Sequence, residues 1–122
     1  MARPIYITTP IYYVNGRPHI GHAYTTIAAD LITRFHRLAG REAFFLTGTD
    51  EHGTKVAEAA AAEGLTPQQF CARIVAACQE AWRNLSIEND DFIRTTSDRH
   101  AAAVHKLLGV LREAKTADGR EV

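Results

Sequence analysis

The chain opens with two kinds of hydrophobic pattern, and each kind predicts a different element. Residues 5–9 are β-branched and aromatic, as is typical of a strand. Residues 43–47 form a continuous apolar run, which favours a strand covered on both faces of a parallel sheet. Between them lies an amphipathic helix beginning near Gly21, with Gly40 as its C-terminal stop. Its apolar residues fall on one face: Ile20, Tyr24, Ile27, Ala28, Leu31, Phe35 and Leu38.

Helical patterns dominate the rest of the chain. A short Ala-rich helix is predicted over about residues 55–63, and a second helix begins at a capping box, Thr66-Pro67-Gln68-Gln69, and ends near Asn84. Residues 92–95 predict a short strand, and residues 116–122 predict a frayed or truncated tail. The apolar stripe of the second helix comprises Phe70, Ile74, Ala77, Cys78, Ala81, Trp82 and Leu85. Ser97 is expected to cap a last helix, with Val104, Leu107, Leu108 and Leu111 directed inward.

The order strand, helix, strand predicts an α/β fold with parallel strands and crossover helices. Such a unit has a right-handed crossover, and ligands gather at the carboxyl ends of its strands. The loop over residues 10–22 and the loop over residues 48–54 each follow a predicted strand. We therefore expect both loops to face one crevice.

Composition excludes some classes of protein without selecting one. The 122 residues are enough for one domain, and 14 Lys and Arg balance 14 Asp and Glu, so net charge gives no argument for a nucleic-acid or anionic-membrane partner. No apolar run has the length of a membrane span, and no signal-peptide core is present, so a cytoplasmic location is expected. Cys71 and Cys78 are two helical turns apart, about 10 Å, which is too far for a disulfide and predicts buried thiols.

His19 and His22 are the first candidates for chemistry, because their i, i+3 spacing places them on one side of a helical turn. Each imidazole can donate a hydrogen bond to a phosphate oxygen, and a helix start aims free backbone N–H groups at an anion. Gly21 leaves room for a flat ring against the backbone. Two other readings stay open at this point: ordinary polar residues at a helix start, or a shared zinc ion, although no Cys or carboxylate follows at the spacing of a closed structural site.

Four stretches then resemble one family. Pro18-His19-Ile20-Gly21-His22 resembles the His-Ile-Gly-His signature of class I aminoacyl-tRNA synthetases. Residues 6–16, 44–54 and 90–96 resemble the methionyl-tRNA synthetase family in particular, and the likeness covers roughly residues 4–115. It implies the first half of a Rossmann-like nucleotide-binding fold, with residues 1–122 as the amino-terminal half of a catalytic domain.

The resemblance implies a reaction in which the carboxylate of L-methionine attacks the α-phosphate of ATP, bound with Mg²⁺. This gives methionyl adenylate and pyrophosphate, and the methionyl group then passes to the 3′ end of tRNA. His19 and His22 would be the catalytic groups that hold the triphosphate, and Gly21 would accept the adenine ring.

On the methionine side, the family pattern implies that Asp50 pairs with the ammonium group, while Tyr13 and the backbone of Ile11 touch the side chain. The purely structural alternatives to these roles are a loop-capping role for Asp50 and packing at the sheet edge for Tyr13. Five residues belong to the same motifs in a supporting role: Asn15, Gly16, Pro18, His52 and Gly53.

Several parts of the family pattern have no counterpart in these 122 residues. They are a Lys-Met-Ser-Lys-Ser-like loop, the zinc knuckle with its cysteine ligands, and the helical anticodon-binding domain. We therefore expect a fragment or a shortened protein that lacks half of its active site, most of its tRNA contacts and any metal site. Two other functions remain possible: a stand-alone nucleotidyltransferase with a His-x-Gly-His motif, against which the Asp50 loop argues, and a non-catalytic nucleotide-binding fragment.

Overall fold

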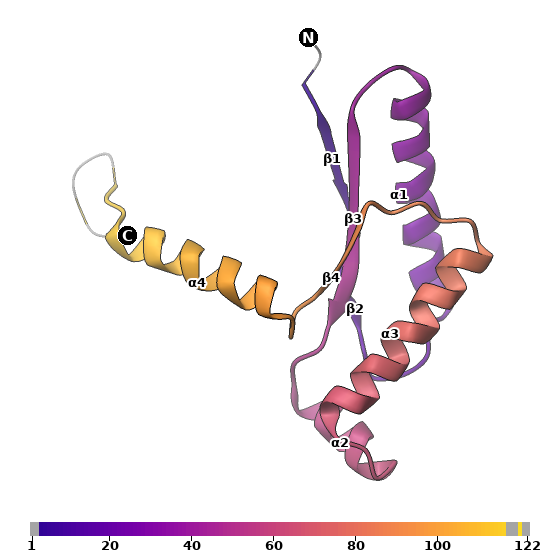
Figure 1. Ribbon diagram of the computed structural model, residues 1–122, viewed down its shortest axis with the longest axis vertical. Helices are drawn as coiled ribbons and strands as arrows, with labels where there is room; N and C mark the ends of the chain where they lie inside the picture. Colours follow the sequence, from indigo (N-terminus) through magenta and orange to yellow (C-terminus); the bar gives the residue numbers. More distant parts are fainter. Residues whose placement is uncertain (1–2, 117–119, 121–122) are drawn as a thin grey trace.

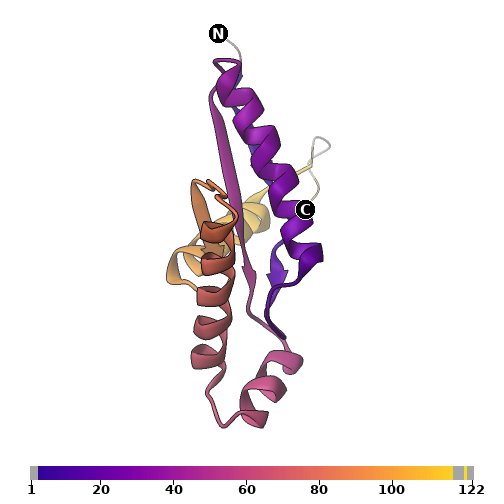
Figure 2. The same cartoon turned by 90° about the vertical axis from the view of Figure 1, so that its right-hand side faces the viewer.

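A computed structural model describes residues 3–116 and 120, and it has the predicted α/β fold with parallel strands (Figure 1). Residues 117–119, 121 and 122 of the predicted tail lie outside the described residues. The elements in chain order are β1 (Ile5–Thr8), β2 (Tyr12–Tyr13), α1 (Ile20–Leu38), β3 (Ala43–Asp50), α2 (Thr54–Ala62), α3 (Pro67–Asn84), β4 (Asp91–Arg94) and α4 (Asp98–Glu113). Helices α1 and α3 lie on one side of the strands, and α4 projects from the other side (Figures 1 and 2).

Strand β3 is the centre of the sheet, and every pairing with it is parallel. Strands β1 and β2 follow each other along one edge of β3, whereas β4 pairs with residues 46–49 and so takes the other edge. Thr8 pairs with Leu46 and Tyr12 with Thr49, so four steps along the first edge match three steps of β3. The first edge therefore has one extra residue, which forms a bulge around Pro10. Proline has no backbone N–H to donate to the neighbouring strand.

This pairing corrects both predicted site loops. Residues 10–22 are not all loop, because the strand resumes at β2 after the bulge. Residues 48–50 are the end of β3, so the second loop begins only at Glu51. A β-carbon on Gly48 would lie 2.1 Å from the backbone oxygen of Ile93 in β4, which explains why glycine occupies the middle of a strand.

Helix α1 begins and ends close to the prediction, but its apolar face is not the packed face. Thr26, Ala29, Asp30 and Thr33 are its buried residues. The three polar ones can be buried because their side chains have hydrogen-bond partners. Asp30, for example, accepts from the backbone N–H of Glu88 at 2.8 Å. The seven residues of the predicted apolar face are exposed or only partly buried within the described part of the chain, from Ala28 to Leu38 at 89% exposed.

The prediction that both faces of β3 are covered is also wrong for this chain. Phe44 is 43% exposed, and its ring stacks on that of Tyr6, which is 62% exposed, at 5.7 Å between centroids. The prediction for α4 is wrong as well. This helix has no buried residue, and the four residues that were expected to point inward are exposed. Ser97 does occupy the N-cap position of α4, but its hydroxyl donates to the carbonyl of Arg94 and does not cap the helix.

The core lies where α2 and α3 pack against β2 and the residues after it. It consists of Tyr12, Val14, Val56, Ala60, Phe70, Cys71, Ile74, Cys78 and Trp82. The two cysteines are free and buried, as predicted, and burial raises the pKa of Cys78 to about 11. The predicted capping box is present: the Thr66 hydroxyl accepts from the backbone N–H of Gln69, and the Gln69 side chain accepts in return from that of Thr66.

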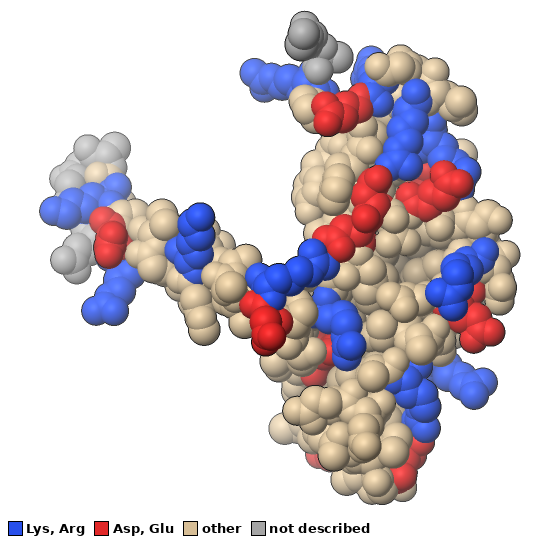
Figure 3. Space-filling model, in the orientation of Figure 1, with Lys and Arg blue, Asp and Glu red and all other residues tan. Residues whose placement is uncertain are grey.

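Within the described residues, no helix has both the length and the hydrophobicity that a membrane crossing requires. Acidic and basic side chains are interspersed over the face seen in Figure 3, in keeping with their equal numbers in the sequence.

Candidate functional site

His19 and His22 form a reciprocal cap at the first turn of α1. Nδ1 of His19 accepts a hydrogen bond from the backbone N–H of Gly21 at 3.1 Å, and Nδ1 of His22 accepts from that of His19 at 3.2 Å. The two rings stack at 3.9 Å between centroids. Because a neutral imidazole that accepts at Nδ1 carries its proton on Nε2, both rings are left with an Nε2–H donor.

The protonation of His22 supports this arrangement. Partial burial lowers the pKa of His22, and the neighbouring His19 lowers it further. The ring of His22 therefore stays neutral near pH 7 and keeps the Nδ1 lone pair that the cap requires.

The cap changes the expected source of hydrogen-bond donors. The backbone N–H of Gly21 is occupied by His19 Nδ1, and that of His22 donates to the carbonyl of His19 at 3.0 Å. The expectation that free backbone N–H groups face an anion is therefore wrong for these two groups, and the imidazole Nε2–H groups are the donors that remain. Gly21 also gives the His19 ring its space, since a β-carbon there would lie 3.0 Å from Cε1 of His19.

Strand β2 connects the two histidines with the end of β3. The ring of Tyr12 meets the ring of His22 edge-on, at 5.2 Å between centroids. Tyr12 is only 3% exposed, and its hydroxyl bonds to the hydroxyls of Thr26 in α1 and, at 2.6 Å, Thr47 in β3. Tyr12 thus fixes the start of α1 relative to the central strand.

The next residue, Tyr13, belongs to the second half of the candidate site. It pairs in register with Asp50, and its hydroxyl would lie 2.6 Å from a β-carbon built on Gly53. The backbone N–H of His52 is 3.4 Å from Oδ1 of Asp50, the only bond to this carboxylate in the described part of the chain. Tyr13 thus packs at the edge of the sheet, which was the structural alternative to a role in substrate binding, and it does so beside Asp50.

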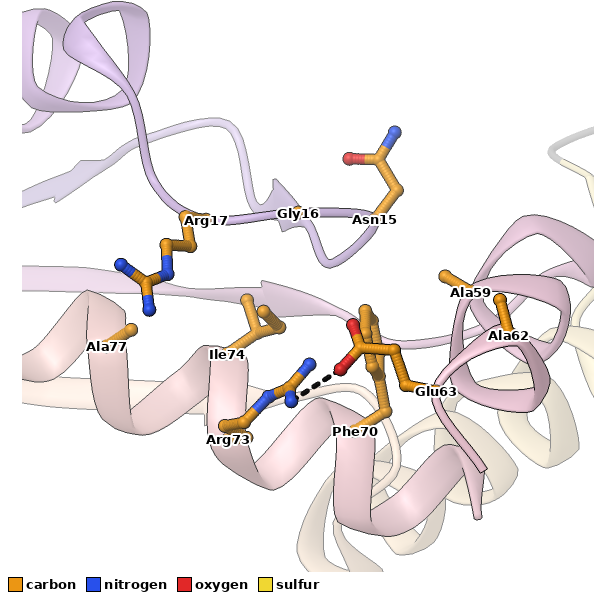
Figure 4. Close-up of a pocket in the computed structure, with 10 residues that line it drawn as sticks. All are labelled: Asn15, Gly16, Arg17, Ala59, Ala62, Glu63, Phe70, Arg73, Ile74 and Ala77. Carbon is orange, nitrogen blue, oxygen red and sulfur yellow. Dashed lines mark ion pairs between the residues drawn. The ribbon is translucent and has the colours of Figure 1, made fainter. Parts of the chain in front are cut away.

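Other predicted residues lie farther from these contacts. Ile11 is in the bulge before β2 and is 43% exposed. Asn15 and Gly16, with Arg17, line a cavity of about 530 Å³ whose other wall is α2 and α3, and the Asn15 side chain points away from those helices (Figure 4). Pro18 lines a separate hollow beside Arg17.

Among the described residues, no hydrogen bond or ring contact joins the imidazole pair directly to Asp50, and the connection between them runs through Tyr12 and Tyr13. No group of three or more His, Cys, Asp or Glu side chains suited to a metal ion occurs within the same residues.

The residue that sequence reasoning missed is Glu51. Neither the sequence patterns nor the family resemblance gave it a role, but the structure buries it: Glu51 is 4% exposed, whereas His52 is exposed. Burial alone would raise its pKa, but hydrogen bonds from Arg94, Thr96 and Thr49 outweigh burial and lower it. The signal available in the sequence was the run Arg94-Thr95-Thr96, which supplies two of these donors, Arg94 and Thr96, from a segment more than 40 residues away.

Comparison with known proteins gives one consistent result. The family model described as tRNA synthetases class I (M) matches residues 5–121. The Methionine--tRNA ligase of Thermotoga maritima is 53% identical over 108 residues, and that of Rhizobium meliloti is 59% identical over 111 residues. These matches cover 88% and 91% of this chain but only 17% and 22% of the relatives, so the chain spans about a fifth of their length or less.

A solved structure shows the same likeness in three dimensions. The Mycobacterium tuberculosis methionyl-tRNA synthetase, in complex with methionyl-adenylate, superposes with a TM-score of 0.86 at 46% identity. The match covers 90% of this chain and 22% of that one. The predicted resemblance and the predicted fold are both confirmed.

Proposed function

The chain belongs to the tRNA synthetases of class I (M), and from this membership we propose that it provides the amino-terminal half of the site that activates L-methionine with ATP and transfers it to tRNA. Membership in this family argues against the stand-alone nucleotidyltransferase. The proposal covers residues 1–122 as one part of a catalytic domain, because the relatives are several times longer.

On the nucleotide side, we propose that His19 and His22 hold the triphosphate of ATP and act in catalysis. The observation that carries this proposal is the reciprocal cap, since it fixes two rings side by side that each accept at Nδ1 and keep an Nε2–H donor. Fixed donors stabilise the charge that develops on phosphate oxygens during adenylate formation and need no reorganisation. Gly21 would accept the adenine ring.

On the methionine side, Asp50 would pair with the ammonium group of the substrate. In support, its carboxylate ends the central strand and lacks a cationic partner among the described residues. Tyr13 and Ile11 would contact the thioether side chain, to which aromatic and aliphatic walls are suited. Asn15, Gly16, Pro18, His52 and Gly53 would shape the loops around these groups.

Mg²⁺ would enter with ATP as part of the substrate, where it neutralises phosphate charge. The described residues do not fit a zinc site, because they contain no cluster of metal-binding side chains, and no step proposed for this chain uses zinc.

Calorimetric titration of the chain with a non-hydrolysable methionyl-adenylate analogue tests the proposal. We expect measurable binding that weakens at least about tenfold in Asp50→Asn, because one charge-assisted pair is lost. Asp91→Asn is the matched control, since it removes a carboxylate from the start of β4 without touching the proposed site. The absence of any binding heat would contradict the proposal for this chain and would favour a fragment that does not bind the substrate.

A further inference from the structure

The carboxylate of Glu51 is held by donors from two strands at the edge where the proposed site lies. Oε1 accepts from Nε of Arg94 at 2.7 Å and from the hydroxyl of Thr49 at 2.8 Å. Oε2 accepts from a terminal nitrogen of Arg94 at 3.0 Å and from the hydroxyl of Thr96. Each oxygen thus has two donors, and the Arg94 pair is bidentate, which restricts orientation as well as distance.

The backbone around this pair is joined at the same place. The backbone N–H of Thr95 donates to the carbonyl of Thr49 at 3.2 Å, and that of Glu51 donates to the hydroxyl of Thr95 at 2.9 Å. The ring Nε2 of His52 lies 3.3 Å from the carbonyl of Thr95. Residues 94–96, at the end of β4, are therefore hydrogen-bonded to the end of β3 and to the two residues that follow it, Glu51 and His52.

Asp50 and His52 flank Glu51 on either side. Asp50 is partly exposed and His52 is exposed, whereas the Glu51 side chain is fully buried. The alternation directs Glu51 into the protein and its neighbours outward. A rigid hold on Glu51 therefore sets the backbone from which Asp50 projects.

Stability alone poorly explains this ion pair, in which the Glu51 side chain is buried and the Arg94 side chain stays 34% exposed. Removing a carboxylate from water is costly, and well-packed apolar residues of similar volume are often as stable or more stable. An apolar pair, however, would not fix the orientation of the segment as a bidentate bond does.

We propose that Glu51, paired with Arg94, is a positioning residue that sets the orientation of Asp50 toward the amino group of methionine. This inference rests on the proposed function and extends it to residues that touch no substrate. It also gives the family-like stretch over residues 90–96 a role that its sequence did not reveal.

Steady-state kinetics separates positioning from simple stability. We would use a hybrid enzyme in which residues 5–115 replace the matching segment of the Thermotoga maritima Methionine--tRNA ligase. Glu51→Gln keeps the shape of the side chain but removes its charge. We expect KM for methionine to rise on the order of tenfold, with KM for ATP nearly unchanged, because only the Asp50 side of the site is misplaced.

Two further variants keep the test decisive. Asp91→Asn breaks another bidentate pair, in which Arg99 donates to both oxygens of Asp91 at 2.7 and 2.8 Å. This pair is more exposed and lies at the other end of β4. Neither KM for methionine nor KM for ATP should therefore change in this variant. Thr96→Val removes a single donor to Glu51 and should raise KM for methionine less than Glu51→Gln does; it serves as the test if Glu51→Gln does not fold.

Equal values of KM for methionine in Glu51→Gln and Asp91→Asn would overturn the positioning role and leave the proposed function intact. So would an equal rise of KM for methionine and KM for ATP. If the unaltered hybrid shows no methionine-dependent activity, the proposed function and this inference fail together. Amide hydrogen exchange in the 122-residue chain gives a readout without substrate: residues 50–53 should lose protection in Glu51→Gln and keep it in Asp91→Asn, and unchanged protection in both would contradict the inference.

Discussion

The imidazoles of His19 and His22 each accept a backbone N–H of the first turn of α1, and their rings stack on one another. Each histidine thus has one nitrogen bound within the protein and one left as a donor. A capping box normally uses a hydroxyl and a carboxamide or carboxylate for this purpose. Here the same two side chains both begin the helix and supply the donors that the proposed nucleotide site requires.

Stability should fall below neutral pH because of His22. Its pKa is lowered in the folded chain by partial burial and by the neighbouring His19, whereas in the unfolded chain it returns to about 6.5. The unfolded state then binds the proton more readily, so the contribution is fully present above pH 6.5 and is lost as the pH falls through the folded pKa.

The measurement is the urea midpoint between pH 5 and 7.5 in the wild type and in His22→Gln. Glutamine can cap the backbone N–H of His19 without titrating, so the pH dependence should be smaller in the variant. An identical pH dependence in the two proteins would show that His22 is not responsible.

Gly53→Ala should destabilise the chain by about 1–3 kcal/mol. Gly53 has φ of 118°, a value that side-chain-bearing residues rarely adopt, and a β-carbon there would meet the hydroxyl of Tyr13. Gly64→Ala is the control, because its φ of 67° is also positive but no atom lies within 4 Å of the added carbon. Urea unfolding should show a larger loss for Gly53→Ala, and adding Tyr13→Phe should recover part of it; no recovery would mean that the contact is unimportant.

Tyr12→Phe should cost about 1–2 kcal/mol, because it leaves buried hydroxyls of Thr26 and Thr47 without a shared partner. Tyr6→Phe removes a hydroxyl of the same kind from an exposed residue of β1 and should change little. The free energy of unfolding from urea titration compares the two variants directly. Similar values for both would contradict the structural role given to Tyr12.

Much of the fold was predictable from the sequence, because its signals are local. The capping box at Thr66, the stop at Gly40 and the apolar run of β3 each act within a few residues. The sequence did not predict β2, because a proline such as Pro10 usually ends a strand and begins a loop. Here Pro10 lies in a bulge, and pairing with β3 resumes at Tyr12.

The burial of α1 was mispredicted for a different reason. Its packed face is polar and depends on partners distant in sequence, such as the backbone of Glu88 for Asp30. Helical periodicity cannot show such partners. The exposed apolar residues of α1 and α4 show likewise that a periodic pattern identifies a face but not what that face contacts.

In the candidate site too, features set by neighbouring residues were predictable and features set by distant residues were not. The positions of His19 and His22 followed from their spacing and their place before a helix, and their assignment to a reaction came from resemblance. The roles of Tyr12 and Glu51 depend on residues 14 to 45 positions away, so no local pattern could reveal them.

Exchange of labelled pyrophosphate into ATP by the hybrid with the Thermotoga maritima enzyme tests the central claim most directly, since it reports adenylate formation alone. The unaltered hybrid should exchange label only when methionine and Mg²⁺ are present. His22→Ala should reduce that rate by a factor of about 100 or more, because a fixed donor to the phosphates is lost. His105→Ala, on the exposed helix α4, should leave it unchanged. Exchange that persists in His22→Ala, or that does not depend on methionine, would contradict the account.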